Sequence, residues 1–386
     1  MQKYEEGHID GQLLLSILAI SSHILGVSSL WTSQSLKSCL NYLITQNSFD
    51  LDTLGDTIPL SRFQQACLLA FYQFHQAPGP RAWLRVSELT REAYHYGLHQ
   101  IDNPRQCQLY NNLSMTAEET EEWRRVWWCI YCLDSYCNIT SSTPFVIDLD
   151  SVRTALISST HATQPHDSVF LPSDSRDLWE TSKAVSSRPG DFQVNVHMVT
   201  TTILRKAGKL VNLWRLNPTP QIDASFKALD DHLSAVRLAL PSRYLDVSRN
   251  IVMNESLAEH HARLICVLHL HATRLMINIP RNFDVGEESW RQAWQAVLES
   301  CEDVVSIVKQ WKAQLCSSVD PAICFIITGV LMVLHLHSID AVNSDSVEFL
   351  ARLRGHKDLL RLFVEQFASI WHLPRFLIGK YLTCKT

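Results

Sequence analysis

The stretch EEWRRVWWCIYCLDSYC, residues 121–137, concentrates three tryptophans, three cysteines and two arginines in one short segment. Arg124, Trp127, Tyr131 and Asp134 recur every three or four residues, a spacing that places them along one face of a helix. Large aromatic side chains on one helical face favour burial against neighbouring helices. The stretch therefore predicts a core helix and, with it, a helical fold.

Residues on either side define the limits of this helix. Glutamates occupy its first turns, where the positive end of the helix dipole stabilises them: Glu118, Glu119, Glu121 and Glu122. We expect the helix to run from about residue 118 to residue 138. Asp134 lies about 14 Å along the axis from the paired arginines. That distance is too long for a direct pair, so we expect its partner to come from another helix.

The rest of the chain follows the same pattern. Its 386 residues are 46% apolar, enough for a large core, and include only 12 glycines and 14 prolines. These are too few for a turn-rich sandwich or for phosphate-binding loops. Apolar residues recur at helical spacing and no stretch alternates as a strand would. We predict an all-α array of about a dozen helices in two lobes, with helices near residues 11–30, 33–46, 62–76, 81–97, 118–138, 192–216, 221–240, 254–279, 287–316, 321–341 and 346–372.

A segment rich in Ser, Thr, Asp and Pro interrupts the helical pattern in the middle of the chain. It lacks sustained periodicity and is typical of a loop or linker. We therefore expect an N-terminal helical lobe over residues 1–138, a loop or linker over 139–190, and a C-terminal helical lobe over 191–386.

Charge and hydropathy exclude several classes of protein. The formal net charge is −5, and the longest basic run is the pair Arg124 and Arg125, so no cationic face is available for phosphate groups. We therefore expect no direct nucleic-acid binding. The N-terminus is acidic ahead of its apolar run, unlike a secretory signal. The longest apolar run, residues 322–334, is shorter than the roughly 20 residues of a membrane span. The sequence predicts a soluble, intracellular protein.

Eleven cysteines raise the question of a metal site. Cys129, Cys132 and Cys137 lie within one predicted helix and lack a fourth donor and a second paired-cysteine motif. Most other cysteines lie among apolar residues, where thiols act as small core side chains. His95 and His99 have the i, i+4 spacing of a chelating pair, but no catalytic Glu lies between them. We expect no metal and no cofactor in this chain.

The sequence lacks the motifs of the enzyme classes that an all-α chain could represent. An all-α, metal-dependent terpene-cyclase-like enzyme needs acidic motifs, but the Asp230–Asp231 pair lacks the following carboxylate and residues 343–349 supply no second motif. Acyl transfer through His260 and His261 lacks the usual aspartate, because Ile265 occupies its place. Neither a nucleophile elbow nor a phosphate loop is present. The sequence favours a protein that is not an enzyme; a helical scaffold or dimerisation protein remains an alternative to a regulator.

Two motifs together resemble a known family. RAWLRVSELTREAYHYGLHQID, residues 81–102, is followed about twenty residues later by the stretch quoted first. This pairing resembles the regulatory middle homology region of fungal-specific transcription factors, the partner of binuclear zinc-cluster DNA-binding domains. The apolar run near residue 13 and the segment from Leu268 are similar to further elements of that family. The positions that match are Trp83, Ala93, Gly97, Leu98, His99, Arg124, Arg125, Trp127, Trp128 and Asp134.

The sequence departs from the family at two places. Ser142, Thr143 and Pro144 stand where the family often has Gly-Arg-Pro. The six-cysteine zinc cluster is absent, so zinc is expected only in that domain, which either precedes this chain or has been lost.

The resemblance implies a nuclear regulator of metabolic or secondary-metabolite genes that reaches promoter DNA through a missing domain or a partner. Its expected partners are coregulators or a second transcription factor, and the resemblance also allows a homodimer and a small-molecule effector; we expect no membrane partner. The candidate regulatory pocket or core motif comprises Trp83, Gly97, His99, Arg124, Arg125, Trp127, Trp128, Tyr131 and Asp134. The Ser/Pro-rich loop after Ile139 would cover such a pocket.

Overall fold

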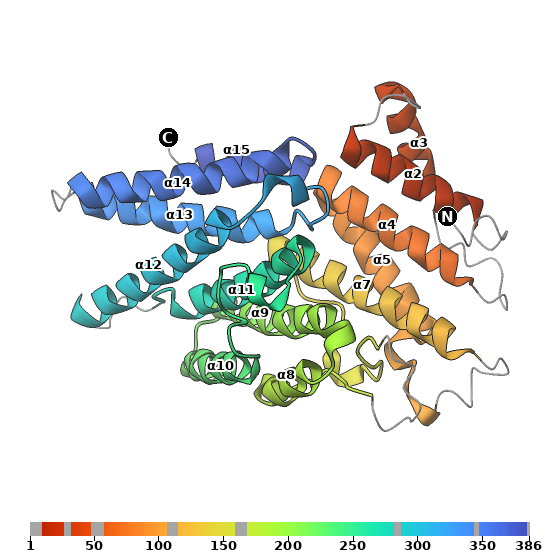
Figure 1. Ribbon diagram of the computed structural model, residues 1–386, viewed down its shortest axis with the longest axis horizontal. Coiled ribbons are helices and arrows are strands. Elements are labelled where there is room, and N and C mark those ends of the chain that lie inside the picture. Colours follow the sequence, from red (N-terminus) through yellow and green to blue (C-terminus); the bar gives the residue numbers. More distant parts are fainter. Residues whose placement is uncertain are drawn as a thin grey trace. The chain divides into compact units, whose positions relative to one another are not determined.

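The computed structural model describes residues 10–26, 32–47, 58–105, 115–158, 168–281, 287–342 and 347–383. Within these ranges the regular structure consists of thirteen α-helices and several short 3-10 turns, and no strand is present (Figure 1). The predicted all-α class and the approximate number of helices are confirmed.

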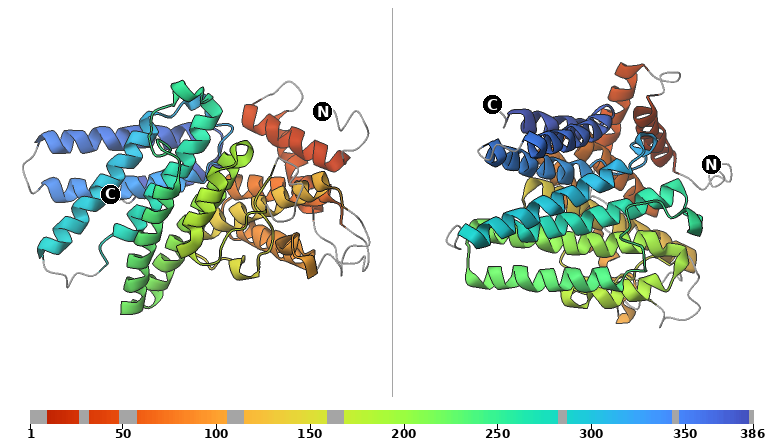
Figure 2. Two further views of the ribbon diagram at one scale, coloured as in Figure 1. Left: turned by 60° about the horizontal axis from the view of Figure 1, so that its bottom comes forward. Right: turned by 60° about the vertical axis from the view of Figure 1, so that its left-hand side comes forward.

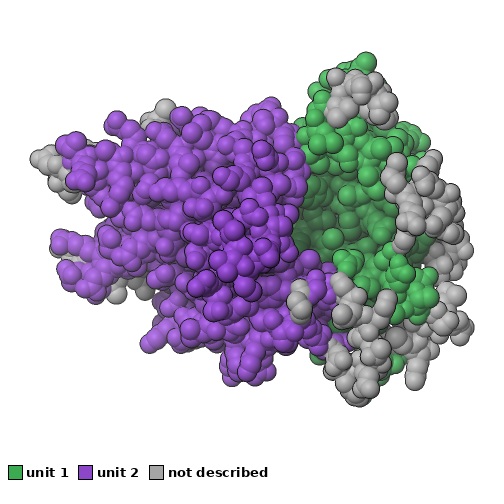
Figure 3. Space-filling model, viewed as in Figure 1, with its two compact units in different colours: residues 1–137, 145–155 green, residues 138–144, 156–386 purple. Residues whose placement is uncertain are grey.

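The chain divides into two compact units, which Figure 3 colours separately. Unit 1 comprises residues 1–137 and 145–155, and unit 2 comprises residues 138–144 and 156–386. Unit 1 is therefore built from two separate pieces of sequence. The boundaries at 138 and 190 expected from composition describe lobes that are each continuous in sequence. In the structure the chain passes into unit 2 at residue 138, returns to unit 1 at residue 145 and enters unit 2 again at residue 156.

Unit 1 contains α2 (Gly11–Leu25), α3 (Ser33–Gln46), α4 (Leu60–Gln76), α5 (Pro80–His95) and most of α7 (Ala117–Ser141). Helix α4 packs against α2 and α5. The half-buried Arg85 on α5 joins three elements: it donates to Gln73 on α4 and to the carbonyls of Ile44 and Asn47 at the end of α3. The carbonyls at a helix end have no partner within the helix, so Arg85 satisfies groups that would otherwise be left unpaired.

Unit 2 contains α8 (Leu178–Ser186), α9 (Phe192–Leu216), α10 (Pro220–Ala239), α11 (Leu257–Asn278), α12 (Glu287–Lys309), α13 (Ile323–Val342), α14 (Val347–Ala368) and α15 (His372–Thr383). Helix α11 lies between α9 and α12 and is buried along most of its length. Helices α13, α14 and α15 pack side by side, as the blue ribbons of Figure 2 show.

Several helix limits differ from those predicted. The first helix stops at Leu25 because Gly26 adopts a left-handed conformation, and the predicted residues 27–30 lie outside the described ranges. Helix α12 ends at Lys309, short of the predicted residue 316. Helix α11 begins at Leu257, where Ser256 and Glu259 form a reciprocal capping box.

Two short helices were not predicted. Helix α8 has nine residues and lies within the segment expected to be a loop. The last predicted helix, residues 346–372, stops where α15 begins, so α15 itself was not predicted, and the buried Trp371 lies in a break between α14 and α15. Pro374 at the third position of α15 agrees with the preference of proline for a first helical turn.

Helix α13 is long and apolar enough to cross a membrane by length and composition, over Ile323–Asp340. This window is longer than the apolar run 322–334 noted in the sequence. Half of the longer window is buried inside the protein, and α13 packs against α12, α14 and α15. We therefore interpret α13 as a core helix of unit 2.

Candidate functional site

The candidate motif of unit 1 begins at the end of helix α5. Gly97 has φ 73°, a left-handed conformation that suits glycine and turns the chain into a 3-10 turn at Leu98–Gln100. Two hydrogen bonds hold this turn against residues 152–155: the Arg153 amide donates to the His99 carbonyl at 2.6 Å, and the Thr154 hydroxyl donates to the Leu98 carbonyl at 2.6 Å. The glycine therefore positions a turn that binds a distant part of unit 1.

Arg124 on α7 fastens the same turn. Its guanidinium donates through Nε and Nη2 to the two carboxylate oxygens of Asp102 and through Nη1 to Glu121. Both Arg124 and Asp102 are about 85% buried, with side-chain exposures of 15% and 14%. Burial alone would lower the pKa of Arg124, but the hydrogen bonds and charges of Asp102 and Glu121 outweigh it and raise that pKa.

Asp102 extends the Arg124 contact to the return segment, which we define as residues 145–155. The Ala155 amide donates to Asp102 Oδ2 at 2.8 Å, and the Ala155 carbonyl accepts from Nε1 of Trp128 at 2.8 Å. Arg124 and Trp128 on α7 therefore hold the last residue of the return segment between them.

Asp134 holds the beginning of the return segment. Its side chain is fully buried, and its two carboxylate oxygens accept from the amides of Val146 and Ile147 at 3.1 and 3.2 Å. These two contacts are with backbone amides of a loop, and the expected partner from another helix stays a prediction. Three motif residues of α7, namely Arg124, Trp128 and Asp134, together fasten the return segment.

The aromatic rings of the motif fill the interior of unit 1. Trp127, Trp128 and Tyr131 are at most 1% exposed, and the rings of Trp128 and Tyr131 meet edge to face at 5.5 Å. Trp127 lies against Tyr94, whose hydroxyl accepts from the Asp148 amide in the return segment. Tyr94 also contacts His99, and burial lowers the pKa of that histidine.

Two motif residues do not join this cluster. Trp83 is half-buried near the start of α5, about 16 Å along the helix axis from Tyr94. Arg125 is exposed, unlike its neighbour Arg124. None of the residues of the predicted pocket lines either cavity of unit 2, and their role in effector binding stays a prediction.

The cysteines of the same helix have different environments. Cys129 is exposed, Cys132 is half-buried and Cys137 is buried. Burial, together with the charge of Asp134, raises the pKa of Cys137 to about 12, which opposes the thiolate that a metal requires. Among the described residues, no three His, Cys, Asp or Glu side chains come together as a metal site would need.

The other residues weighed for chemistry are also dispersed. His260 and His261 contact backbone atoms: His260 meets the Val247 carbonyl, and His261 meets the Leu257 carbonyl and accepts from the Lys312 amide. Asp230 and Asp231 are both exposed on α10. The segment 343–349 lies partly outside the described residues.

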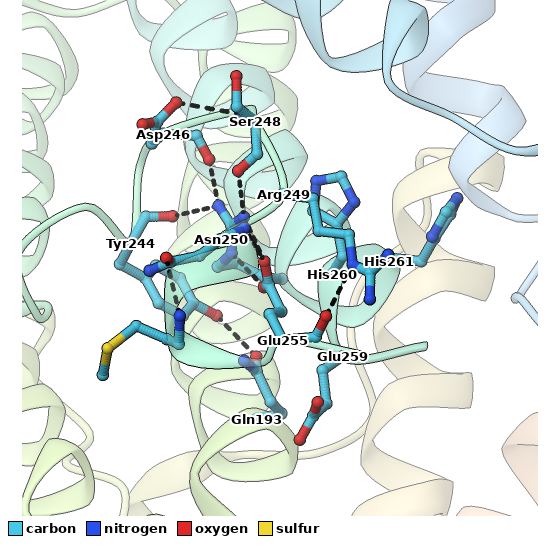
Figure 4. Close-up of polar contacts among 12 residues, drawn as sticks. Gln193, Tyr244, Asp246, Ser248, Arg249, Asn250, Glu255, Glu259, His260 and His261 are labelled. Carbon is cyan, nitrogen blue, oxygen red and sulfur yellow. Dashed lines mark hydrogen bonds and ion pairs between the residues drawn. The ribbon is translucent and has the colours of Figure 1, made fainter. Parts of the chain in front are cut away.

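Unit 2 contains a buried arginine, Arg263, that sequence reasoning missed; Figure 4 labels its partners Tyr244, Asp246, Ser248 and Glu255. Arg263 on α11 donates through Nε and Nη2 to both carboxylate oxygens of Glu255, at 2.7 and 3.0 Å. Its remaining bonds reach the carbonyls of Tyr244, Asp246 and Ser248.

Glu255 is ionised in this environment. Burial opposes its charged form, but hydrogen bonds from Arg263 and from the Asn250 amide outweigh burial and lower the pKa of Glu255. The loop 244–255 is therefore fastened to α11, and it presents three exposed apolar side chains, Ile251, Val252 and Met253. A cavity of about 210 Å³, lined in part by Arg243 and Arg249, lies beside them.

Some of these partners could have been found from the sequence. Asp102 follows the Gly97 turn within the motif of residues 81–102, and a buried arginine requires such a carboxylate. Val146 and Ile147 carry no such signal, because any residue has a backbone amide. Glu255 stands next to the capping residue Ser256, a position where a glutamate is usually exposed to solvent. The sequence therefore gave no sign that Glu255 pairs with Arg263 on α11.

The protein is all-α, and the motif residues Arg124, Trp128 and Asp134 have a structural role, because they hold the return segment against α7. Its sequence matches the model of the fungal specific transcription factor domain over residues 1–209, more than half of the chain. The chain therefore belongs to the fungal-specific transcription factor domain family, as the sequence analysis predicted. No curated protein and no solved structure matches the chain. The segment from Leu268, which also resembles the family, lies beyond the matched residues.

Proposed function

We propose that this protein acts in the nucleus and controls metabolic or secondary-metabolite genes together with a DNA-binding partner or domain. The family match over residues 1–209 carries the proposal, since that family is a regulatory domain of transcription factors. The net charge of −5 supports promoter binding through another polypeptide or domain. Coregulators are the expected partners, and catalysis is not part of the proposed role.

A reporter assay tests the regulatory role. The full chain is fused to a heterologous DNA-binding domain, and the reporter is measured against that domain alone. We expect a change in transcription that is lost in Arg124→Met, because this variant releases Asp102 and the return segment, and is kept in the matched Arg125→Met variant. An unchanged reporter with a folded fusion would favour the scaffold alternative over a regulator.

A second experiment tests the location and the target genes. The chain is deleted and overproduced in its source organism, and transcripts are sequenced while a fluorescent fusion is imaged. The proposal expects nuclear fluorescence and coordinated changes in a group of metabolic genes. Cytoplasmic fluorescence under all conditions, or no coordinated change, would contradict it.

A further inference from the structure

Loop 244–255 of unit 2 exposes three consecutive large apolar side chains. Ile251, Val252 and Met253 form a 3-10 turn and are 72%, 84% and 74% exposed. We call these three residues the apolar tip. Such runs in solvent are rare on folded proteins and mark surfaces that a partner covers. The apolar tip lies beyond residues 1–209, so the family match assigns it no role.

The loop that carries the apolar tip is held in one conformation. Arg263 on α11 bonds both carboxylate oxygens of Glu255 and three carbonyls of the loop. Within the loop, the Asn250 amide donates to Glu255 at 2.7 Å (Figure 4), and the Asn250 side chain accepts from the Met253 amide at 3.4 Å. A loop fixed in this way keeps the apolar tip at the surface and loses little further entropy when a partner binds.

Two arginines line the cavity of about 210 Å³ beside the apolar tip, together with Ile251 and Val252. Arg243 and Arg249 are both exposed, and within the part of the chain that the structure describes neither forms an ion pair. Nε of Arg249 donates to the Glu255 carbonyl at 2.7 Å, which fixes one edge of its guanidinium. The two side chains therefore place positive charge next to the exposed apolar surface.

The acidic residues of this surface do not cancel that positive charge. Asp246 belongs to the cavity lining, and its carboxylate accepts from the Ser248 amide. Glu255 and Glu259 lie nearby, but their carboxylates are already bonded within the protein. The lining therefore holds two positive charges against one negative charge, in a chain whose net charge is −5. This surface suits an acidic partner, whereas the chain as a whole disfavours a nucleic acid.

The shape of the cavity favours a protein over a lipid surface. Its volume of about 210 Å³ lies below the roughly 300–1,000 Å³ of small-molecule sites and is comparable to one large side chain. A side chain that projects from a peptide can enter it. A planar bilayer would contact the apolar tip and leave the cavity unfilled.

From these features we propose that the apolar tip, Arg243 and Arg249 form a docking site for an acidic segment of a partner protein. Large apolar side chains of that segment cover the apolar tip. A carboxylate of aspartate or glutamate enters the cavity and meets the two guanidinium groups. The docking stands on this surface alone, whereas the identity of the partner as a coregulator rests on the proposed function.

Selection of short peptides from a displayed random library, with the full chain as bait, tests the docking. We expect the retained peptides to combine aspartate or glutamate with leucine, isoleucine, phenylalanine or tryptophan. One retained peptide, labelled, should bind saturably in fluorescence anisotropy, and its affinity should fall as salt is added, because charge pairs at an exposed surface are screened. Failure to retain any peptide, or retention of peptides without acidic residues, would overturn the proposal.

Two variants locate the site. Val252→Asp and Arg243→Glu should each weaken binding of the labelled peptide about tenfold or more, and both positions are exposed, so the fold should be unchanged. Leu216→Asp is the matched control, because Leu216 is 83% exposed and ends α9, about 35 Å along that helix from Gln193, which bonds Tyr244 of the loop. Circular dichroism checks the fold of each variant. Equal affinity of Val252→Asp and Leu216→Asp would refute the site.

Two further probes separate a protein partner from other macromolecules. Vesicles of equal parts phosphatidylcholine and phosphatidylserine should not sediment the chain, and a labelled DNA duplex of random sequence should not bind it. Vesicle binding that Val252→Asp abolishes would identify a lipid site, and duplex binding that Arg243→Glu abolishes would identify a nucleic-acid site. Either result would overturn the proposal.

The docking and the proposed function fail separately. Peptide binding without any reporter response would leave the docking site intact and count against transcription regulation. A reporter response that Val252→Asp leaves unchanged, with no peptide retained, would do the reverse.

Discussion

Each unit contains a buried arginine that fastens a loop to a helix, but the two arrangements differ in reach. Arg263 in unit 2 is 5% exposed and donates hydrogen bonds to Glu255 and to carbonyls of the loop 244–255, whose tip is exposed. Arg124 in unit 1 binds Asp102, which in turn binds the Ala155 amide. A buried arginine therefore holds a surface loop in unit 2, whereas in unit 1 it joins two pieces of the chain that are separate in sequence.

The units also differ in their buried histidines, and this difference predicts the largest effect. Burial lowers the pKa of His197 and of His337 to about 4. The unfolded chain takes up these protons near pH 6.5, whereas the folded unit 2 does not until about pH 4. Stability should fall between pH 6.5 and pH 4 by roughly 3 kcal/mol for each histidine.

Urea unfolding at several pH values, with hydrogen exchange to separate the units, measures this loss. Unit 2 should lose protection before unit 1. His337→Phe keeps a ring stacked on Trp294 and should make the dependence on pH shallower. A stability that does not change over this pH range would contradict the assignment.

The next effect tests the surface loop of unit 2. Arg263→Met leaves Glu255 charged and buried and removes the donor from three carbonyls, so we expect a loss of about 3–5 kcal/mol in the free energy of unfolding. Arg176→Met is the control, because Arg176 and its partner Asp174 are exposed and such pairs contribute at most about 1 kcal/mol. Similar urea midpoints for the two variants would contradict the contribution of Arg263.

Adjacent arginines in unit 1 allow a sharper comparison. Arg124→Met should cost about 2–3 kcal/mol, since Asp102 would lose its main partner. Arg125→Met alters an exposed neighbour and should change stability by less than about 0.5 kcal/mol. The urea midpoints of the two variants decide this, and equal values would show that the fastening of the return segment does not depend on Arg124.

The adjacent tryptophans provide a similar pair with a smaller difference. Trp128→Phe removes the bond to the Ala155 carbonyl, whereas Nε1 of Trp127 has no hydrogen-bond partner among the described residues. Trp128→Phe and Trp127→Phe lose the same ring volume, so Trp128→Phe should be less stable than Trp127→Phe by about 1–2 kcal/mol. Thermal unfolding compares the two, and the opposite order would rule out a structural role for that bond.

The smallest effect concerns the turn after α7. Ser142 has φ 55°, a left-handed conformation, at the position where the family often has glycine. Ser142→Gly should remove this strain and raise stability by up to about 1 kcal/mol, visible as a higher Tm. Ser141→Gly is the control. Ser141 is still helical, and glycine destabilises a helix, so this variant should be less stable than the wild type. A lower Tm for Ser142→Gly would mean that the hydroxyl matters more than the backbone.

The sequence was sufficient to predict most of the long helices, but it did not predict α8, α15 or the burial of Arg263. The three- and four-residue spacing around Trp127 and the turn at Gly97 are local signals, and both produced the expected elements. Asp134 was expected to need a partner, and two of its contacts are with the loop amides of Val146 and Ile147, which no residue type identifies. Helix α8 is too short to show periodicity, and Pro374 was the available but unused signal for the start of α15.

The two-piece composition of unit 1 has a genetic consequence. A premature stop at any of codons 142–146 would remove all of unit 2 downstream of it and also the Ala155 and Val146–Ile147 backbone groups that Trp128, Asp102 and Asp134 engage. The translated product would retain every helix of unit 1, yet its buried carboxylates would face no amide. The shortest gene fragment expected to encode a folded unit 1 therefore extends through codon 155.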